Sequence, residues 1–223
     1  MKPVQTFWFT VTIIYRSLNC INILLSIIIG HYYLYPNESI QFINIIKLMK
    51  YSHFIILCLL QLYLITSTPF QWYKQYTIHS CIYIFIATYT LTSFHIYWMV
   101  YFIDSNIIIE NPELNKLPLY YLHFINSMGV IVIITDALLW KPKRIPFLVS
   151  YIPCCMFISI YIAYLEITNS LNDYIELPDS DILSILYRFL YYLLLWLIIT
   201  IFNIFSYVII RLLHLKKKQQ MNY

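Results

Sequence analysis

Long apolar stretches alternate with short polar segments along this chain of 223 residues. Six stretches reach the length of about 20 apolar residues that a helix needs to cross the hydrocarbon core of a bilayer. They cover residues 7–30, 48–68, 78–103, 119–140, 146–168 and 183–213. Prolines, asparagines and acidic residues gather in the connections between them. The pattern predicts an all-α, polytopic membrane protein with six transmembrane helices, forming one transmembrane domain over residues 1–223.

Composition supports this prediction. Hydrophobic residues make up 61% of the chain and charged residues only 11%, whereas soluble domains carry about 25% charged residues. The net charge of +4 is concentrated in short clusters beside the apolar stretches, so no broad basic face is available for nucleic acid. We expect membrane lipids with anionic headgroups as partners and no nucleic acid. Neither the five cysteines nor the six histidines have metal-ligand spacing, so we expect no metal and no cofactor.

The charges of the connections predict an orientation. Basic residues collect on one side of the predicted bundle, at Lys2, Lys74, Lys141, Lys143, Arg144, Arg211 and Lys216 to Lys218, and most acidic residues fall on the other side. Because short cytosolic loops carry the excess of Lys and Arg, both termini are predicted in the cytosol. Six spans agree with that parity. The predicted location is integral to the plasma membrane or the endomembrane system.

Polar residues inside the predicted spans separate into two layers. Toward the outer side lie Ser52, His53, His95, His123, Asn126 and Ser127. At 100° per residue, His123 and Asn126 are about 60° apart and share a helix face. Arg16 and Asp136 lie in the inner half, where they are expected to form a buried ion pair or to reach the inner headgroups separately.

The outer layer has two interpretations. A serine hydroxyl can attack an ester carbonyl once a neighbouring imidazole takes its proton, and an Asn can orient that base or stabilise an oxyanion. The hydroxyl candidates are Ser52 and Ser127, the imidazole candidates are His123, His53 and His95, and Asn126 is the amide. Alternatively, these side chains form hydrogen bonds between helices and hold the bundle together. A weaker third hypothesis is a carrier of small solutes.

The fourth predicted helix carries His123, Asn126 and Ser127, followed by Asp136 and then Pro142 and Arg144. This order resembles the HxxNS…D…P signature of rolling stone proteins. The preceding helix is similar to theirs in Thr92, Tyr97, Trp98 and Tyr101, and residues 50–54 with Gln61 resemble the opening of the second helix in the wider androgen-induced gene family. The resemblance implies a six-helix membrane protein.

One branch of that family hydrolyses fatty-acid esters of hydroxy fatty acids with a Thr nucleophile and a His base. The resemblance aligns the base with Asn126, which cannot act as a general base, and the nucleophile with Ser52 or His53. Hydrolysis of lipid esters by this chain would therefore use Ser52 as nucleophile and His123 as base. The alternative is a non-catalytic membrane protein whose polar layer stabilises the bundle or binds lipid.

Overall fold

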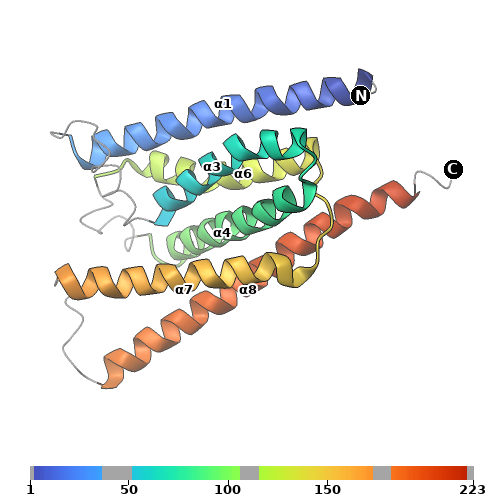
Figure 1. Cartoon of the computed structure of the whole chain (residues 1–223). Coiled ribbons are helices and arrows are strands. Elements are labelled where there is room, and N and C mark those ends of the chain that lie inside the picture. The colour runs from blue at the N-terminus through green and yellow to red at the C-terminus, as the bar shows by residue number, and fades with distance from the viewer. Residues whose placement is uncertain (1–2, 37–51, 106–115, 173–181, 220–223) are drawn as a thin grey trace.

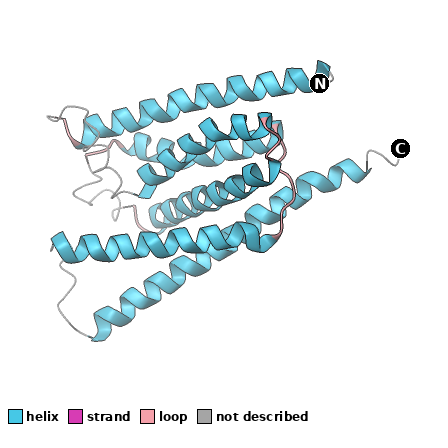
Figure 2. Cartoon of the chain, in the orientation of Figure 1, coloured by secondary structure: helices cyan, strands magenta, loops and turns pink. Residues whose placement is uncertain are grey.

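The computed structural model describes residues 3–36, 52–105, 116–172 and 182–219, and within these ranges every regular element is a helix (Figure 2). The helices are α1 (Pro3–Leu34), α3 (Ser52–Trp72), α4 (Tyr76–Ile103), α6 (Leu119–Leu139), α7 (Phe147–Asn172) and α8 (Ile182–Gln219) (Figure 1). Each predicted apolar stretch corresponds to one of them. The all-helical architecture is therefore confirmed for the described residues.

The helix α4 lies in the middle of the bundle. It packs against α3 and α6 on one side and against α7 and α8 on the other, while α1 covers α3 and α6. The start of α1 and the end of α8 lie at the same end of the bundle (Figure 1). Neighbouring helices along the chain run in opposite directions, as short connections require.

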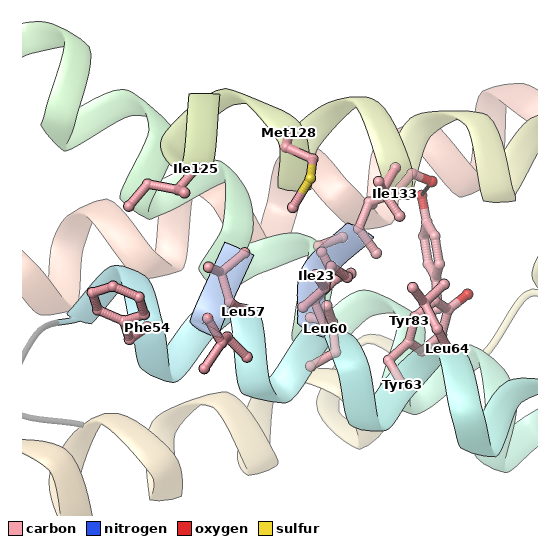
Figure 3. Close-up of a cluster of buried hydrophobic side chains, with 14 of the residues drawn as sticks. Ile23, Phe54, Leu57, Leu60, Tyr63, Leu64, Tyr83, Ile125, Met128 and Ile133 are labelled. Atoms are coloured by element: carbon pink, nitrogen blue, oxygen red, sulfur yellow. Dashed lines mark hydrogen bonds between the residues drawn. The ribbon is translucent and has the colours of Figure 1, made fainter. Parts of the chain in front are cut away.

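Two apolar clusters hold the helices together. The larger joins α1, α3, α4 and α6, and Figure 3 shows part of it, including Ile23, Leu57, Leu60 and Ile133. The smaller joins α4, α7 and α8 and consists of Tyr89, Cys154, Ile158, Leu195 and Ile199. Because α4 contributes to both clusters, it links the two halves of the molecule.

The outward faces of the helices are also apolar. Leu18, Ile131 and Leu197, for example, are exposed over 57%, 64% and 56% of their surface. In water, contiguous apolar surface of this extent causes association, but in a bilayer the acyl chains cover it. Five of the described helices are long and apolar enough to cross a membrane: α1, α3, α6, α7 and α8. The fold is thus that of a multi-pass integral membrane protein.

The remaining helix, α4, is not among these five, and most of its buried polar residues lie in its first two thirds. Its 28 residues include His79, Ser80, Thr88, Thr90 and Thr92, all of them buried. The Thr88 and Thr92 hydroxyls donate to carbonyl oxygens one turn earlier in the same helix, at 2.7 and 2.8 Å. A helix surrounded by other helices can carry such groups, since none of them has to be exposed to acyl chains.

The second helix continues further than the apolar pattern predicts. The pattern ends this span at residue 68, before the segment TPFQWYK, whereas α3 includes Pro69 and ends at Trp72. Proline removes one backbone hydrogen bond from a helix interior. Gln71 compensates, because its side chain is buried and bonds to α1 and α4. Lys74 then adopts a left-handed backbone with φ of 58° and completes the tight turn into α4.

Proline also shapes α7. Pro153 has no N–H to offer the carbonyl of Val149 one turn earlier. The Cys81 thiol of α4 donates to that carbonyl instead, with Sγ 3.2 Å from the oxygen. A side chain of the neighbouring helix thereby takes the place of the missing backbone donor.

Both glycines of the chain lie where helices touch. A Cβ on Gly30 of α1 would lie 2.3 Å from the Phe54 ring and 2.7 Å from the Tyr121 hydroxyl oxygen. Tyr121 donates from that hydroxyl to the carbonyl of Ser26, so α6 is held against α1 at this level. A Cβ on Gly129 of α6 would lie 2.7 Å from the Thr90 methyl group. The close approach of α1, α3 and α6 therefore depends on Gly30.

We expect Gly30→Ala to destabilise the bundle, even though alanine is the better helix former by about 1 kcal/mol. Overpacking a closely packed contact costs about 1–3 kcal/mol, and three atoms lie closer than 3.0 Å to the added methyl group. The melting temperature of the purified protein in detergent should fall. Ser17→Ala, at an exposed position of the same helix, is the control. A melting temperature equal to that of the control would contradict the close contact.

Candidate functional site

Arg16 and Asp136 form a bidentate ion pair inside the bundle. The Arg16 Nε of α1 donates to Asp136 Oδ1 of α6 at 2.7 Å, and Nη2 donates to Oδ2 at 3.0 Å. The two side chains are only 2% and 0% exposed. The structure therefore favours the buried pair over separate contacts with headgroups. Two charges at this depth are tolerated because each neutralises the other in a planar, two-bond geometry.

Three further side chains complete a polar network around the pair. The Tyr63 hydroxyl of α3 donates to Asp136 Oδ2 at 2.5 Å, and Gln71 Oε1 accepts from Arg16 Nη1 at 2.8 Å. His79 of α4 places its Nε2 3.0 Å from Gln71 Nε2 and 3.4 Å from the Tyr63 hydroxyl. Four helices thus meet in one hydrogen-bonded network, which we call the inner network: Arg16, Tyr63, Gln71, His79 and Asp136.

The chemistry of the inner network determines its proton positions. Because Gln71 Oε1 accepts from the guanidinium, the amide nitrogen of Gln71 faces His79 and can only donate. The Nε2 atom of His79 is therefore the acceptor, and the ring proton of a neutral imidazole lies on Nδ1. Every charged atom of the ion pair has a partner, which is the condition under which buried charges persist.

His123 of α6 lies in a cluster of aromatic side chains from the neighbouring helix α4. Its Nδ1 is 2.8 Å from the Tyr97 hydroxyl of α4. The imidazole stacks on Trp98 with ring centroids 4.9 Å apart and an interplanar angle of 10°, and it meets Tyr101 edge-on at 4.7 Å. These contacts hold the ring in one orientation between α4 and α6.

Ser127 and Asn126 bond in different directions. Ser127 Oγ accepts from the Trp98 indole nitrogen at 3.2 Å, so it joins α6 to α4 one turn below His123. The buried Asn126 donates from Nδ2 to the carbonyl of Leu122 in its own helix at 2.9 Å. In this geometry one of the two amide N–H groups of Asn126 is used within α6.

Two other predicted residues of the outer layer, His53 and His95, contact aromatic rings of their own. His95 is exposed and packs against Phe202 of α8, with ring centroids 5.2 Å apart. His53 packs against Phe54 at the start of α3 in a tilted geometry, with ring centroids 4.7 Å apart. Ser52 is the first residue of α3, and its side chain lies outside the described residues. Ser127 and His123 share Trp98 as a partner, whereas His53 and His95 contact the rings of Phe54 and Phe202.

A shallow depression of about 320 Å³ lies elsewhere, between α7 and the first half of α8. It is lined by Ser159, Ile162, Phe189, Tyr192, Leu193 and Trp196. Among the residues described by the structure, no group of three or more His, Cys, Asp and Glu side chains could hold a metal ion. The inner network contains the predicted residues Arg16 and Asp136, and the aromatic cluster contains His123 and Ser127.

Comparison of the chain with family models, curated proteins and solved structures finds no match. The class of protein is consequently defined by the fold alone, an all-helical integral membrane protein. Its resemblance to the androgen-induced gene family stays a prediction that rests on the residues of α3, α4 and α6.

The sequence pattern does not reveal Tyr63, Gln71 and His79 as members of the inner network. Gln71 follows Pro69 in a segment that resembles a loop, and His79 stands near the start of an apolar stretch. A signal does exist. Tyr63 and Gln71 are eight residues apart, so they lie on nearly the same face of a helix that continues through the proline. Arg16 lies in the first predicted span at a depth similar to that of Tyr63 and Gln71 in the second.

A double-mutant cycle tests the energetic role of the ion pair. Arg16→Met leaves a buried carboxylate, and Asp136→Asn leaves a buried guanidinium. Each is expected to lower the free energy of unfolding by about 3–5 kcal/mol, because a lone buried charge is costly. The double variant should be more stable than either single variant. Equilibrium unfolding in mixed detergent micelles measures all three.

The matched control is Thr10→Ala on α1, since the exposed Thr10 hydroxyl bonds only to the carbonyl of Thr6 in its own helix. Strictly additive losses in the double variant would mean that the two charges do not stabilise each other.

Proposed function

We propose that this chain is a non-catalytic, six-span membrane protein. Its polar side chains hold the helices in one arrangement and bind lipid. One observation carries the proposal: the inner network connects α1, α3, α4 and α6 through paired, buried groups. Polar contacts between helices contribute about 0.6–2 kcal/mol each in membranes, and they also select one helix register over others. The contacts of Tyr97 with His123 and of Trp98 with Ser127 serve the same purpose toward the outer side.

The proposal includes α4 as the sixth span and places both termini in the cytosol, in the plasma membrane or an endomembrane. Three observations support this topology. The 28 residues of α4 exceed the length needed to span, and α4 is surrounded by four other helices. The start of α1 and the end of α8 lie at the same end of the bundle, and the basic residues collect at that end. We also propose membership of the androgen-induced gene and rolling stone family, for which His123, Asn126, Ser127 and Asp136 are the support.

Two exposed lysines test the topology as a matched pair. Lys74 lies in the turn between α3 and α4, and Lys116 precedes α6 at the opposite end. In sealed vesicles with the cytosolic face outward, a membrane-impermeant maleimide should label Lys74→Cys at once. Lys116→Cys should react only after the vesicles are opened. The wild-type chain, whose five cysteines are buried or half-buried, gives the background. The reverse pattern of labelling would overturn the proposed orientation.

A second candidate function is hydrolysis of lipid esters such as fatty-acid esters of hydroxy fatty acids. The observation that favours it is the orientation of His123. Tyr97 holds Nδ1, and Nε2 has no hydrogen-bond partner among the described residues. Such an imidazole can act as a base in the tautomer that donates its Nδ1 proton to the Tyr97 oxygen, because Nε2 is then unprotonated. Ser52, at the start of α3, would be the nucleophile.

Labelling with a lipid-like fluorophosphonate distinguishes the two functions. For the non-catalytic protein we expect no serine-dependent labelling of the folded wild type, and lower melting temperatures for His123→Ala and Ser127→Ala. Ser127→Ala should cost about 0.5–1.5 kcal/mol, since it removes one hydrogen bond between helices. Ser159→Ala is the control, because this exposed serine bonds only to Cys155 in its own helix.

The hydrolase would give the opposite result. Labelling of the wild type that is lost in both Ser52→Ala and His123→Ala, and retained in Ser159→Ala, would establish catalysis and overturn the first proposal.

A further inference from the structure

Two basic segments that are distant in sequence meet at one end of the bundle. The connection between α6 and α7 carries Lys141, Lys143 and Arg144, and the last turns of α8 carry Arg211. Lys141 Nζ lies 3.4 Å from the carbonyl oxygen of Leu213, and Arg144 Nη2 lies 3.4 Å from that of Arg211. All four basic side chains are exposed. We call them the basic cluster.

The connection that carries the basic cluster is anchored to the bundle. The backbone N–H of Lys143 donates to Ser80 Oγ of α4 at 2.7 Å, and Ser80 itself is fully buried. Ile145 is buried in the same apolar cluster as Ile210 of α8. The charged side chains therefore project from a backbone of fixed shape, unlike those of a flexible polybasic tail.

No carboxylate neutralises the basic cluster within the described part of the chain. Of the ten acidic residues, the structure describes three. Asp136 is paired with Arg16 inside the bundle. Asp104 follows the end of α4, and Glu166 lies in the last turns of α7, both at the opposite end of the bundle from the basic cluster. The single hydrogen bonds of Lys141 and Arg144 leave most of their N–H donors available, since an ammonium has three and a guanidinium five.

We propose that the basic cluster is a binding site for a phospholipid headgroup that carries more than one phosphate, such as a phosphoinositide. At the end of a membrane-spanning bundle these cations lie at the level of the headgroups, where each basic residue near an anionic surface contributes measurably to binding. Several cations in fixed positions can contact several phosphates at once, and guanidinium groups bind phosphate oxygens in pairs. A headgroup with a single charge, such as phosphatidylserine, gains only the general attraction of the positive surface.

The location of the site in the cytosolic leaflet rests on the proposed topology. The binding experiment does not depend on that topology. The protein is purified and reconstituted in phosphatidylcholine nanodiscs, and binding of a fluorescent short-chain phosphatidylinositol bisphosphate is measured by anisotropy. Short-chain phosphatidylserine and free inositol trisphosphate are the competitors. We expect the trisphosphate to compete and phosphatidylserine to compete at least about tenfold more weakly. Equal competition by phosphatidylserine would overturn the site.

The variants separate a built site from general charge. Lys141→Gln and Arg144→Gln should each weaken binding about fivefold, the effect expected for one basic residue at an anionic surface. Lys74→Gln is the matched control, because it removes an exposed cation at the same end of the bundle but outside the cluster. Its affinity should remain within about twofold of wild type. A loss as large as that of Arg144→Gln would mean that only net charge matters, and the site would be rejected.

Ser80→Ala provides a test at constant charge. It removes the acceptor for the Lys143 N–H and so releases the connection, while all cations remain. We expect the preference for the bisphosphate over phosphatidylserine to decrease, and an unchanged preference would contradict the anchored geometry. The melting temperature of each variant is measured beside its affinity, so loss of binding through unfolding is recognised directly.

The two proposals fail separately. Preferential binding of the bisphosphate together with reversed maleimide labelling would retain the basic cluster as a site and reject the orientation. Correct labelling without preferential binding would do the opposite.

Discussion

A carboxylate and a guanidinium that lie inside a lipid-embedded bundle have to be paired, and this requirement organises the half of the molecule that contains the turn between α3 and α4. Either charge alone would cost several kcal/mol in such a place. Arg16 belongs to α1 and Asp136 to α6, so these two helices have to meet at one level and in one rotation. Tyr63 and Gln71 then bring α3 to the same point, and His79 brings α4. Sliding α1, α3 or α6 by one residue would break charged hydrogen bonds, and sliding α4 would break the contacts of His79 with Gln71 and Tyr63.

Apolar packing alone would not define the arrangement so narrowly. Acyl chains are as apolar as leucine side chains, and therefore helices in a bilayer gain little from burying leucine against leucine. What distinguishes one register from another is close contact and polar pairing. The close contact lies near the end of α1, where Gly30 admits Phe54 and Tyr121, and the ion pair lies toward the end of the bundle that contains the turn between α3 and α4. Between these two constraints the apolar residues of Figure 3 fill space.

The sequence predicts the number and approximate positions of the helices well, because membrane helices are recognised by their length and apolar content. It also places Arg16 and Asp136 at similar depth, which makes their contact foreseeable. The side-chain contacts of the outer layer are harder to predict from the sequence. Asn126 and His123 share a helix face, yet the amide of Asn126 turns back to Leu122 while His123 contacts Tyr97. Helical periodicity gives the direction of a Cα–Cβ bond and leaves the rotamer undetermined.

Proline explains the other discrepancy. Pro69 is a helix breaker by propensity, and a boundary at residue 68 follows from that rule. The helix continues because Gln71 and its partners stabilise the last turn more than the missing hydrogen bond costs. A tertiary contact therefore overrides the local propensity, and the spacing of Tyr63 and Gln71 is its trace in the sequence.

The enclosed position of α4 has a consequence for how the protein is made. A nascent helix that carries buried threonines, serine and histidine partitions poorly into lipid when it emerges alone, because its polar groups then face acyl chains. The turn at Lys74 joins α4 to α3 through only a few residues, and Tyr63 and Gln71 of α3 already contact His79 of α4. We expect α3 and α4 to enter the bilayer as one helical hairpin. During biosynthesis, α3 would then shield the polar groups of α4 from the acyl chains until the other helices of the bundle are in place.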